Sequence, residues 1–242
     1  ETYDIERFDR AKETIRSPIT IENEAETERK LRETVLSVSD RYTIVEEITT
    51  EQIKYIEEIF DAVDNLTNAN ESKQKENSED DTSNEPLTTT EMFYQLQEIL
   101  STEITDKVEE LVFMQLIRLE EEDREKGKKL FIDAVKKILN NGVRIENIQS
   151  AKEELNATIK YSTLDDDVKD VLYQLVDFAI VENSFFDVEK TLEARNEAAS
   201  NVEPVIIRSG DIIVREGQII TNEIYEELKL VGVLDNNTKL LP

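Results

Sequence analysis

The sequence predicts a predominantly α-helical α+β protein: a helical bundle with a small β-sheet or hairpin formed by the N- and C-terminal segments. Three observations predict this class. Apolar residues recur at helical spacing through most of the chain, three of the five glycines (Gly210, Gly217 and Gly232) lie near its C-terminus, and short β-branched runs surround them. With 242 residues, 38% of them hydrophobic, the chain can bury a core.

Residues 1–67 are expected to form a helix–strand–helix segment. The run "ITIENEAETERKLRETVLSV" predicts a charged helix that begins at Thr20 or Asn23, and "RYTIV" predicts a short strand. Thr49 and Gln52 have the spacing of a capping box at the start of the next helix. That helix is expected to bury one face, formed by Ile53, Ile56, Phe60, Val63 and Leu66.

The middle of the chain is expected to consist of a loop followed by the bundle. Residues 68–86 are acidic and almost without apolar side chains, so we expect a mobile loop. Residues 87–183 predict a helical bundle, with helices over 90–100, 104–119 and 123–140, and Gly142 as a left-handed cap. Two more helices are expected over "RIENIQSAKEEL" and "LDDDVKDVLYQLVDFAIVE", the second burying Val168, Val171, Leu172, Leu175 and Phe178.

Residues 184–242 are expected to form a helix, a glycine-rich β-hairpin and a C-terminal helix. The runs "PVIIR", "DIIV" and "QII" predict strands, and the glycines between them can adopt the positive φ of tight turns. Thr221 is expected to cap the last helix, with Gly232 just past its end.

A weak internal repeat connects the two ends of the chain. Aligning "ITIENEAETERKLRETVLSVSDRYTI" with "NSFFDVEKTLEARNEAASNVEPVIIR" pairs Ile21 with Phe185, Asn23 with Asp187, Thr27 with Thr191, Glu33 with Glu197, and Val38 with Val202. Both halves predict a charged helix followed by a short strand. We therefore expect two helix–strand units in one sheet, in which Tyr42 to Val45 pairs with a strand of the Val205 to Ile220 region.

The composition excludes several classes of function. With 56 Asp and Glu against 29 Lys and Arg, the formal charge of −27 argues against nucleic acid, or attraction to an anionic membrane, as a binding mode. The absence of His and Cys removes the usual general base, the thiol nucleophile and the zinc sites built on them. The acidic runs "LDDDVKD" and "SEDD" lack the spacing of a calcium loop. No catalytic residue, metal or cofactor is therefore assigned.

The most distinctive segment is "RSGDIIVREGQ". Its candidate structural or relay residues are Gly210, Asp211, Arg215, Glu216, Gly217 and Thr221. One interpretation is structural, with glycine turns and a solvated or salt-bridged Arg215–Glu216 pair. The other is that this hairpin touches a ligand or transmits motion to a following segment.

The two ends of the chain resemble a known family. The C-terminal region contains an Asp, then Thr, Arg and Ala at helical spacing, then Val-x-Pro-Val, a Gly-Asp-x-Ile-Val-Arg-Glu-Gly segment and a Thr-capped helix. The residues are Asp187, Thr191, Arg195, Ala198, Val202, Pro204, Val205, Gly210, Asp211, Ile213, Val214, Arg215, Glu216, Gly217, Thr221 and Gly232. This pattern, with "RSPITIENEAETERKLRETV" near the start, resembles the extracellular domain of the seven-transmembrane receptors that carry an intracellular HD hydrolase domain, the PgpH-type cyclic-di-AMP phosphodiesterases. The chain departs from that pattern at Ser39-Asp40, where the family often has a Pro pair, and at Gly232-Val233, where it has Gly-Leu.

The resemblance implies a location and a role. It implies a domain on the extracellular face of a bacterial cell membrane, inserted between a first transmembrane helix and later membrane segments, with the catalytic His–Asp metal site elsewhere in the parent protein. The chain itself would be no enzyme but a sensory domain that relays an external signal. Its expected partners are an unknown extracellular ligand or envelope component and the transmembrane helices of the parent, and a homodimer is one further option. The alternatives are a structural spacer or dimerisation module of the same receptor, or a free-standing envelope protein that binds peptidoglycan or peptides.

The insertion also implies where the ends lie. The chain starts at Glu1 without Met, which we interpret as a piece of a longer protein. Glu1 and Pro242 are then expected on the same side of the domain, with Cα atoms within about 30 Å of each other, and the loop at 68–86 away from both.

Overall fold

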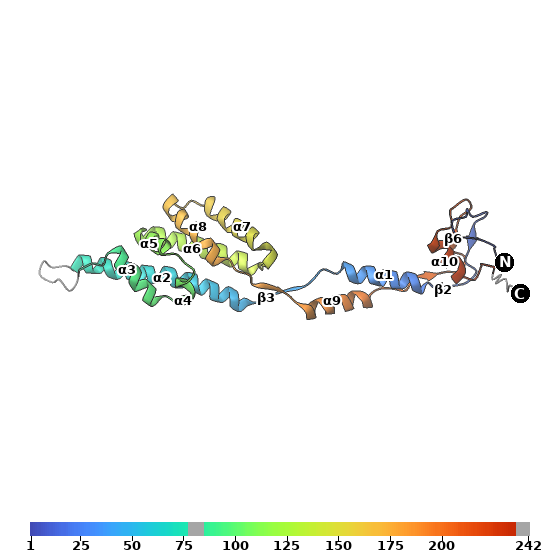
Figure 1. Ribbon diagram of the computed structural model, residues 1–242, viewed down its shortest axis with the longest axis horizontal. Coiled ribbons are helices and arrows are strands. Elements are labelled where there is room, and N and C mark those ends of the chain that lie inside the picture. The colour runs from blue at the N-terminus through green and yellow to red at the C-terminus, as the bar shows by residue number, and fades with distance from the viewer. Residues whose placement is uncertain (77–84, 236–242) are drawn as a thin grey trace. The chain divides into compact units, whose positions relative to one another are not determined.

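A computed structural model describes residues 1–76 and 85–235 of this chain (Figure 1). The chain divides into two compact units. We call Tyr42–Phe186 the inserted unit, and Glu1–Arg41 together with Asp187–Pro242 the terminal unit. The predicted segments 1–67 and 184–242 are therefore each divided between the two units.

The inserted unit is a helical bundle with one small sheet. Strand β3 (Tyr42–Ile44) pairs antiparallel with β4 (Ser184–Phe186), with Thr43 opposite Phe185. Between these strands lie α2 (Glu46–Glu76), α3 (Thr89–Ile99), α4 (Thr102–Thr105), α5 (Glu110–Arg118), α6 (Glu121–Asn140), the 3₁₀ turn η2 (Ile145–Asn147), α7 (Ile148–Lys160) and α8 (Asp166–Ala179).

The core of the inserted unit follows the predicted helical faces. The predicted face of α2 is buried from Ile53 to Val63, while Leu66 is partly buried against the same cluster, and the five predicted residues of α8 are all buried. Arg124 is the largest polar side chain inside, 2% exposed. Its Nε donates to Asp64 at 2.8 Å and its Nη2 donates to the Thr67 hydroxyl at 2.8 Å, so the buried charge is paired and hydrogen-bonded.

Two sequence predictions fail at helix boundaries in this unit. Helix α2 continues through residue 76, so the predicted loop 68–86 is wrong for residues 68–76, and residues 77–84 lie outside the described residues. The helix continues because Asn70 is buried and paired: it donates to the Leu87 carbonyl at 3.1 Å and accepts from the Leu87 N–H at 2.6 Å. The predicted helix 104–119 is broken into α4 and α5, which allows Val108 in the linking segment to join the core.

The predicted capping box of α2 is also wrong. The helix begins at Glu46, three residues before Thr49. The Thr49 hydroxyl instead accepts from Asn183 Nδ2 at 2.8 Å, and Gln52 donates its side-chain amide to the carbonyl of Phe178. Both side chains are therefore used to fix α2 to the end of the unit rather than to cap it.

In its described part, residues 1–41 and 187–235, the terminal unit combines short strands with three helices. Its elements are β1 (Ile15–Arg16), β2 (Ile21–Glu22), α1 (Glu24–Ser37), α9 (Val188–Ser200), β5 (Ile206–Ile207), β6 (Ile212–Val214) and α10 (Asn222–Leu230). Strand β1 pairs with β6 and β2 pairs with β5, both antiparallel. The expectation that N- and C-terminal segments form the small sheets is confirmed.

The predicted hairpin and strand partner are wrong. Strands β5 and β6 pair with the N-terminal strands and not with each other, and Tyr42–Ile44 pairs with β4 rather than with the Val205 to Ile220 region. The physical reason is the position of the two glycine turns. Their backbone groups bond to the N-terminal segment, with Gly210 N–H to Ser17 O at 2.8 Å and Gly217 N–H to Ala11 O at 2.7 Å, so the strands beside them join that segment too.

The weak repeat corresponds to a reciprocal arrangement of α1 and α9, which pack against each other (Figure 1). The Asn23 N–H bonds to Val205 O and the Asp187 N–H bonds to Arg41 O, both at 2.8 Å. Residue Thr27 accepts from the Val205 N–H and its counterpart Thr191 accepts from the Arg41 N–H, both at 2.9 Å. The start of each helix thus binds the segment that follows the other helix, through equivalent positions, and the two helices run antiparallel.

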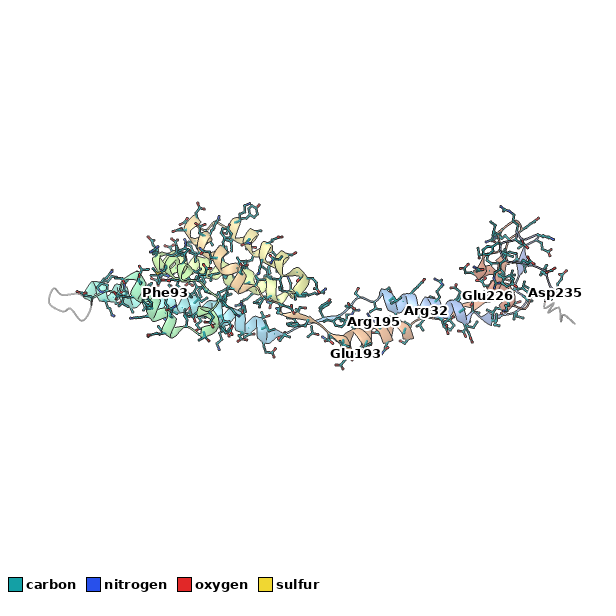
Figure 2. The ribbon with its side chains drawn as sticks, viewed as in Figure 1. Arg32, Phe93, Glu193, Arg195, Glu226 and Asp235 are labelled. Carbon is teal, nitrogen blue, oxygen red and sulfur yellow. The ribbon has the colours of Figure 1, made fainter. Side chains whose placement is uncertain are left out.

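The aligned residues Asn23 and Asp187 cap the N-terminal ends of the two helices. Asn23 accepts from the N–H of Glu26 at 3.2 Å and Asp187 accepts from the N–H of Lys190 at 3.0 Å. Between the caps the pair buries little: α1 has no fully buried residue and α9 has only Thr191. Arg195 of α9 pairs with Asp40 at 3.3 Å, and the labelled Arg195 and Arg32 show where charged side chains line the two helices (Figure 2).

Candidate functional site

The candidate relay residues lie in one part of the terminal unit, residues 1–23 and 205–235, which we call the terminal lobe. They belong to a tandem repeat of seven residues, "RSGDIIV" at 208–214 and "REGQIIT" at 215–221. Each copy begins with a tight turn that contains one of the glycines, and each turn faces a different part of the N-terminal segment.

The first turn is closed by its own residues and by the N-terminal segment. The Arg208 N–H bonds to the Asp211 carboxylate at 2.8 Å, and the Asp211 N–H returns to Arg208 O at 3.0 Å. Gly210 donates to Ser17 O and accepts from Arg16 Nη1, both at 2.8 Å. The Ser209 N–H bonds to the hydroxyl of Thr20 at 3.0 Å, and the Ser209 hydroxyl donates to Pro18 O at 3.4 Å.

The second turn repeats these contacts except for the one from the Ser209 hydroxyl to Pro18 O. The Arg215 N–H bonds to the side-chain oxygen of Gln218, and the Gln218 N–H returns to Arg215 O, both at 3.0 Å. Gly217 donates to Ala11 O at 2.7 Å and accepts from Arg10 Nη1 at 3.0 Å. The N–H of Glu216 bonds to the hydroxyl of Thr14 at 3.1 Å. We call these two motifs the clasped turns.

Both turns depend on glycine for the same reason. Gly210 has φ +91° and Gly217 has φ +79°, a left-handed conformation that strains residues with a Cβ. A Cβ at either position would meet no atom within 4 Å. The requirement is therefore one of backbone conformation and not of space.

Sequence reasoning identified the C-terminal half of this site and missed the N-terminal half. The missed residues are Arg10, Thr14, Arg16 and Thr20, which hold the turns. A signal was present: "RAKET" at 10–14 and "RSPIT" at 16–20 both read Arg-x-x-x-Thr, spaced six residues apart, opposite two turns spaced seven apart. Recognising either repeat would have paired the segments.

The other candidate residues have separate roles. Arg215 and Glu216 are exposed, and among the described residues no ion pair joins their side chains to each other or to a neighbour, which fits the solvated turn. Thr221 caps α10 as predicted, its hydroxyl accepting from the Ile224 N–H at 3.2 Å. Helix α10 is tied back to the N-terminal segment because Arg7 Nη2 lies 2.8 Å from a carboxylate oxygen of Glu226, which Figure 2 labels.

The ends of the described chain meet in the same lobe. Tyr3 and Leu234 form a parallel bridge, in which the Tyr3 N–H bonds to Val233 O at 2.8 Å and the Asp235 N–H bonds to Tyr3 O at 2.9 Å. The predicted distance from Glu1 to Pro242 lies outside the described residues, because Pro242 is not among them.

Two groups in the terminal lobe have perturbed acidity. The pKa of Glu227 on α10 is raised, first by its partial burial and then by the nearby charge of Glu26. The pKa of Tyr3 is raised by desolvation and by the charges of Glu13 and Glu1. The Tyr3 hydroxyl also has a side-chain hydrogen bond with Glu13. Among the described residues, no group of three or more Asp or Glu side chains could hold a metal ion.

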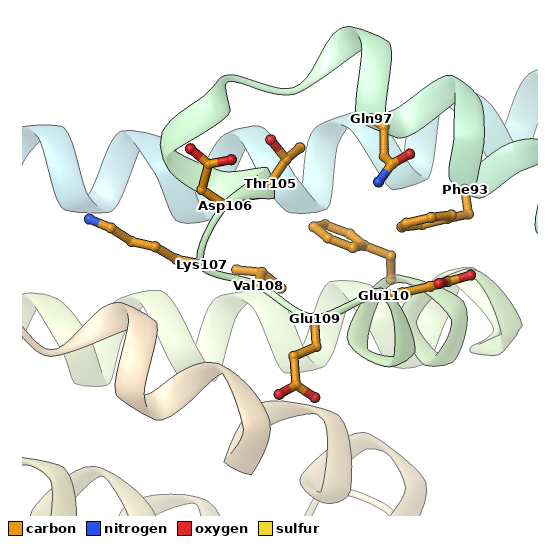
Figure 3. A pocket seen from close by; sticks show the side chains of 9 residues that line it. Phe93, Gln97, Thr105, Asp106, Lys107, Val108, Glu109 and Glu110 are labelled. Carbon is orange, nitrogen blue, oxygen red and sulfur yellow. The ribbon is translucent and has the colours of Figure 1, made fainter.

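A separate cleft of about 310 Å³ lies in the inserted unit beside α3 and the segment that links α4 to α5 (Figure 3). Phe93 and Phe113 form its apolar wall, with ring centroids 6.0 Å apart. Its rim is polar, and Lys107 there is paired with Glu103 at 2.9 Å. Nothing in the sequence analysis predicts this cleft, and it includes none of the candidate relay residues.

Comparison with known proteins agrees with the features of both ends. The family described as 7TM-HD extracellular matches residues 6–235. A cyclic-di-AMP phosphodiesterase PgpH of Bacillus subtilis (strain 168) is 27% identical over 242 residues, covering 100% of this chain and 33% of the relative. The PgpH of Listeria monocytogenes serotype 1/2a (strain 10403S) is 32% identical over 246 residues, covering 97% of this chain and 34% of the relative.

This chain thus spans about a third of the length of these curated relatives. No solved structure matches it. Among the described residues, no helix has the length and apolar character needed to cross a membrane. Because the family match runs through both units and includes the clasped turns, the chain belongs to the family of 7TM-HD extracellular domains.

Proposed function

We propose that this chain is the extracellular regulatory domain of a membrane-bound cyclic-di-AMP phosphodiesterase, and that it relays an external signal to a catalytic domain elsewhere in the parent protein. The proposal places the chain on the extracellular face of a bacterial membrane. It is supported by the family match and by the names of the two relatives. Hydrolysis is assigned to the rest of the parent because a His–Asp metal site needs imidazoles, and this chain has no His.

One observation carries the relay. The clasped turns join the N-terminal segment to the C-terminal tandem repeat by hydrogen bonds. Close to the two ends of the described chain, Tyr3 is paired with Leu234. The inserted unit is joined to this unit by two chain crossings, and the residues at them, Arg41 and Asp187, are themselves hydrogen-bonded. A rearrangement that reaches this lobe would therefore move both chain ends together.

A relay also needs two arrangements that a signal can distinguish, because an effector shifts an equilibrium only through its different affinity for the two states. The α1–α9 pair is the part of the terminal unit best suited to change. It buries only one residue, Thr191, so its two arrangements need not differ greatly in apolar burial. Its ends are held by the reciprocal threonine contacts.

The test is a reversible lock in the parent protein, reconstituted in vesicles. Glu22 and Ile206 are directly opposite residues of the β2–β5 pair, so Glu22→Cys with Ile206→Cys can form a disulfide that ties the start of α1 to the C-terminal strand. This chain contributes no other Cys. A relay predicts that cyclic-di-AMP hydrolysis differs about fivefold or more between the oxidised and reduced forms, the range of typical coupling free energies.

The single-Cys variants Glu22→Cys and Ile206→Cys are the matched controls, because they meet the same oxidant without forming the lock. Equal hydrolysis by the oxidised and reduced double variant, with the disulfide shown to be complete, would contradict the relay. That result would support a spacer whose arrangement does not affect catalysis.

A further inference from the structure

The N-terminal segment and the tandem repeat form one irregular antiparallel ladder. Arg10 lies opposite Ile219, Arg16 opposite Ile212, and Glu22 opposite Ile206. Directly opposite residues point to the same face of an antiparallel pair. Each of the three isoleucines therefore points to the same side as the residue opposite it, Arg10, Arg16 or Glu22.

This face differs from an ordinary solvated one. The second isoleucine of each run is buried, with Ile207 7%, Ile213 8% and Ile220 0% exposed, so those residues form the inner face. The positions that alternate with them are expected to be polar in a sheet with one wet face. Here they are isoleucines, and Ile206 and Ile219 are 41% and 45% exposed.

Phe8 adds a second unusual feature at the end of this ladder. Its N–H bonds to Ile220 O at 2.7 Å, next to the exposed Ile219. Its ring is 67% exposed, and its backbone has φ +69°, a left-handed conformation that is unfavourable for an aromatic residue. The fold therefore holds a large apolar side chain in solvent at a strained position, which is a reason to look for a surface that it contacts.

The two arginines are held in place on the same face. Arg10 and Arg16 each donate one N–H to a glycine carbonyl of a clasped turn, at 3.0 and 2.8 Å. A guanidinium has five N–H donors, and among the described residues neither arginine forms an ion pair. Each therefore keeps donors that suit a phosphate group, at a fixed position.

We propose that this face, made of Phe8, Arg10, Arg16, Ile212 and Ile219 and called the outer face, lies on the surface of a phospholipid bilayer. The inference rests on the proposed function, in which membrane segments flank the chain. Both described chain ends belong to this lobe, because Tyr3 and Leu234 are paired. Phe8 and Ile219 insert among the acyl chains, while Arg10 and Arg16 bind lipid phosphates.

Glu22 marks where the proposed contact with lipid ends along the ladder. At the third pair of the ladder, which leads into α1, the residue opposite the isoleucine is an acid instead of an arginine. The face thus changes from Arg and Ile near the chain ends to Glu and Ile at the start of α1. Residues 1–23 and 205–235 together hold 12 Asp and Glu against 7 Lys and Arg. Contact then depends on insertion and arginine–phosphate pairing, and not on attraction to anionic lipid.

The experiment uses the absence of Trp and His from the chain. A C-terminal hexahistidine tag tethers the chain to phosphatidylcholine vesicles that contain a nickel-chelating lipid, and a single Trp reports contact with lipids brominated in their acyl chains. We expect brominated lipid to reduce the fluorescence of Phe8→Trp and Ile219→Trp at least twofold. Ile206→Trp is the matched control, since Ile206 has the same place in its run and similar exposure, and its fluorescence should not change.

A second pair of variants tests the arginines. In the Phe8→Trp background, Arg10→Gln and Arg16→Gln should each weaken the quenching, while circular dichroism melts confirm that the variants fold. The proposal would be overturned if brominated lipid left the fluorescence of Phe8→Trp and Ile219→Trp unchanged, as expected for Ile206→Trp. It would also be overturned if the lipid quenched all three variants equally. Neither outcome affects the relay, which is measured by hydrolysis in the parent protein, and a failed relay would leave the lipid contact standing.

Discussion

The two units of this protein are stabilised in different ways. Among the described residues, the inserted unit (42–186) has a core cluster of 34 buried apolar residues, whereas the cluster in the terminal unit has nine. In the terminal unit the polar contacts join segments about 200 residues apart, through backbone groups, threonine hydroxyls and two arginines. One unit is held mainly by apolar burial and the other mainly by specific hydrogen bonds.

This difference bears on which unit can change its arrangement. Apolar burial is non-directional, contributes in proportion to area, and makes a packed bundle resist rearrangement. A hydrogen bond contributes only about 0.5–1.5 kcal/mol net, so a ladder of them can be opened in part at modest cost. The terminal unit is therefore the better candidate for a moving part, and the following changes test the contrast.

The largest expected effect comes from a cavity in the inserted unit. Leu139 is 0% exposed on α6, and Leu139→Ala should lower the free energy of unfolding by about 2.7–5.0 kcal/mol. The matched change Leu228→Ala, also at a 0% exposed site but on short α10, should cost less because its surroundings can collapse into the space. Urea unfolding followed by circular dichroism gives both values, and an equal loss would show that the terminal unit is packed as tightly.

The same substitution at two left-handed glycines, one in each unit, should cost different amounts of stability. Gly142→Ala in the inserted unit places a Cβ 3.2 Å from Ile44 and 3.3 Å from Ser184, at φ +85°. We expect Gly142→Ala to lower the free energy of unfolding by about 1–2 kcal/mol through backbone strain and by about 1–3 kcal/mol more through overpacking. Gly217→Ala should show only the backbone cost, since nothing lies within 4 Å. Differential scanning calorimetry measures both, and Gly217→Ala as costly as Gly142→Ala would contradict this account of the clasped turns.

The reciprocal threonines allow a smaller and more specific test. Thr191 is 1% exposed, and Thr191→Val leaves the Arg41 N–H without its acceptor, at an expected cost of about 1–3 kcal/mol. Thr191→Ser keeps the hydroxyl and should restore most of the stability. The equivalent change Thr27→Val should cost less, because Thr27 is only half-buried and water can replace the lost acceptor. Thermal unfolding midpoints of the three variants test this order of stability. A loss at Thr27→Val as large as that at Thr191→Val would contradict it.

The smallest expected effect is electrostatic. Because the folded-state pKa of Glu227 is raised by partial burial and by Glu26, the folded protein binds more protons than the unfolded chain between the two pKa values. Its stability contribution therefore falls as pH rises through that window. Glu227→Gln should raise the melting temperature at pH 7 and leave it nearly unchanged at a pH where Glu227 is protonated. A gain that is the same at both pH values would point to packing instead.

The parts of the fold that sequence predicts well are those set by neighbouring residues. Asn23, Thr221 and Gly142 act as caps where the sequence placed them, because a cap depends only on the adjacent turn of helix. The buried faces of α2 and α8 follow from helical spacing for the same reason. The fold class is confirmed on this basis.

The failures involve partners that lie far away in sequence. The end of α2 is fixed by the hydrogen bonds between Asn70 and Leu87. The strands beside Gly210 and Gly217 pair with N-terminal strands and not with each other. In the candidate site, Gly210 and Gly217 were found because their conformation is local. Arg10 and Arg16 were missed because the turns that they hold lie about 200 residues away, so that only the Arg-x-x-x-Thr repeat around them indicates the pairing.

The insertion of one unit into the other sets an order for events during synthesis. Residues 42–186 are continuous, so the inserted unit can fold as soon as it leaves the ribosome. The first 41 residues cannot, since the strands and turns that they pair with begin only at Asp187. At the roughly 5–20 residues per second of translation, the N-terminal segment waits about 7–30 seconds for its partners. During that time its isoleucines stay unpaired, so a nearby membrane or chaperone has time to shield them.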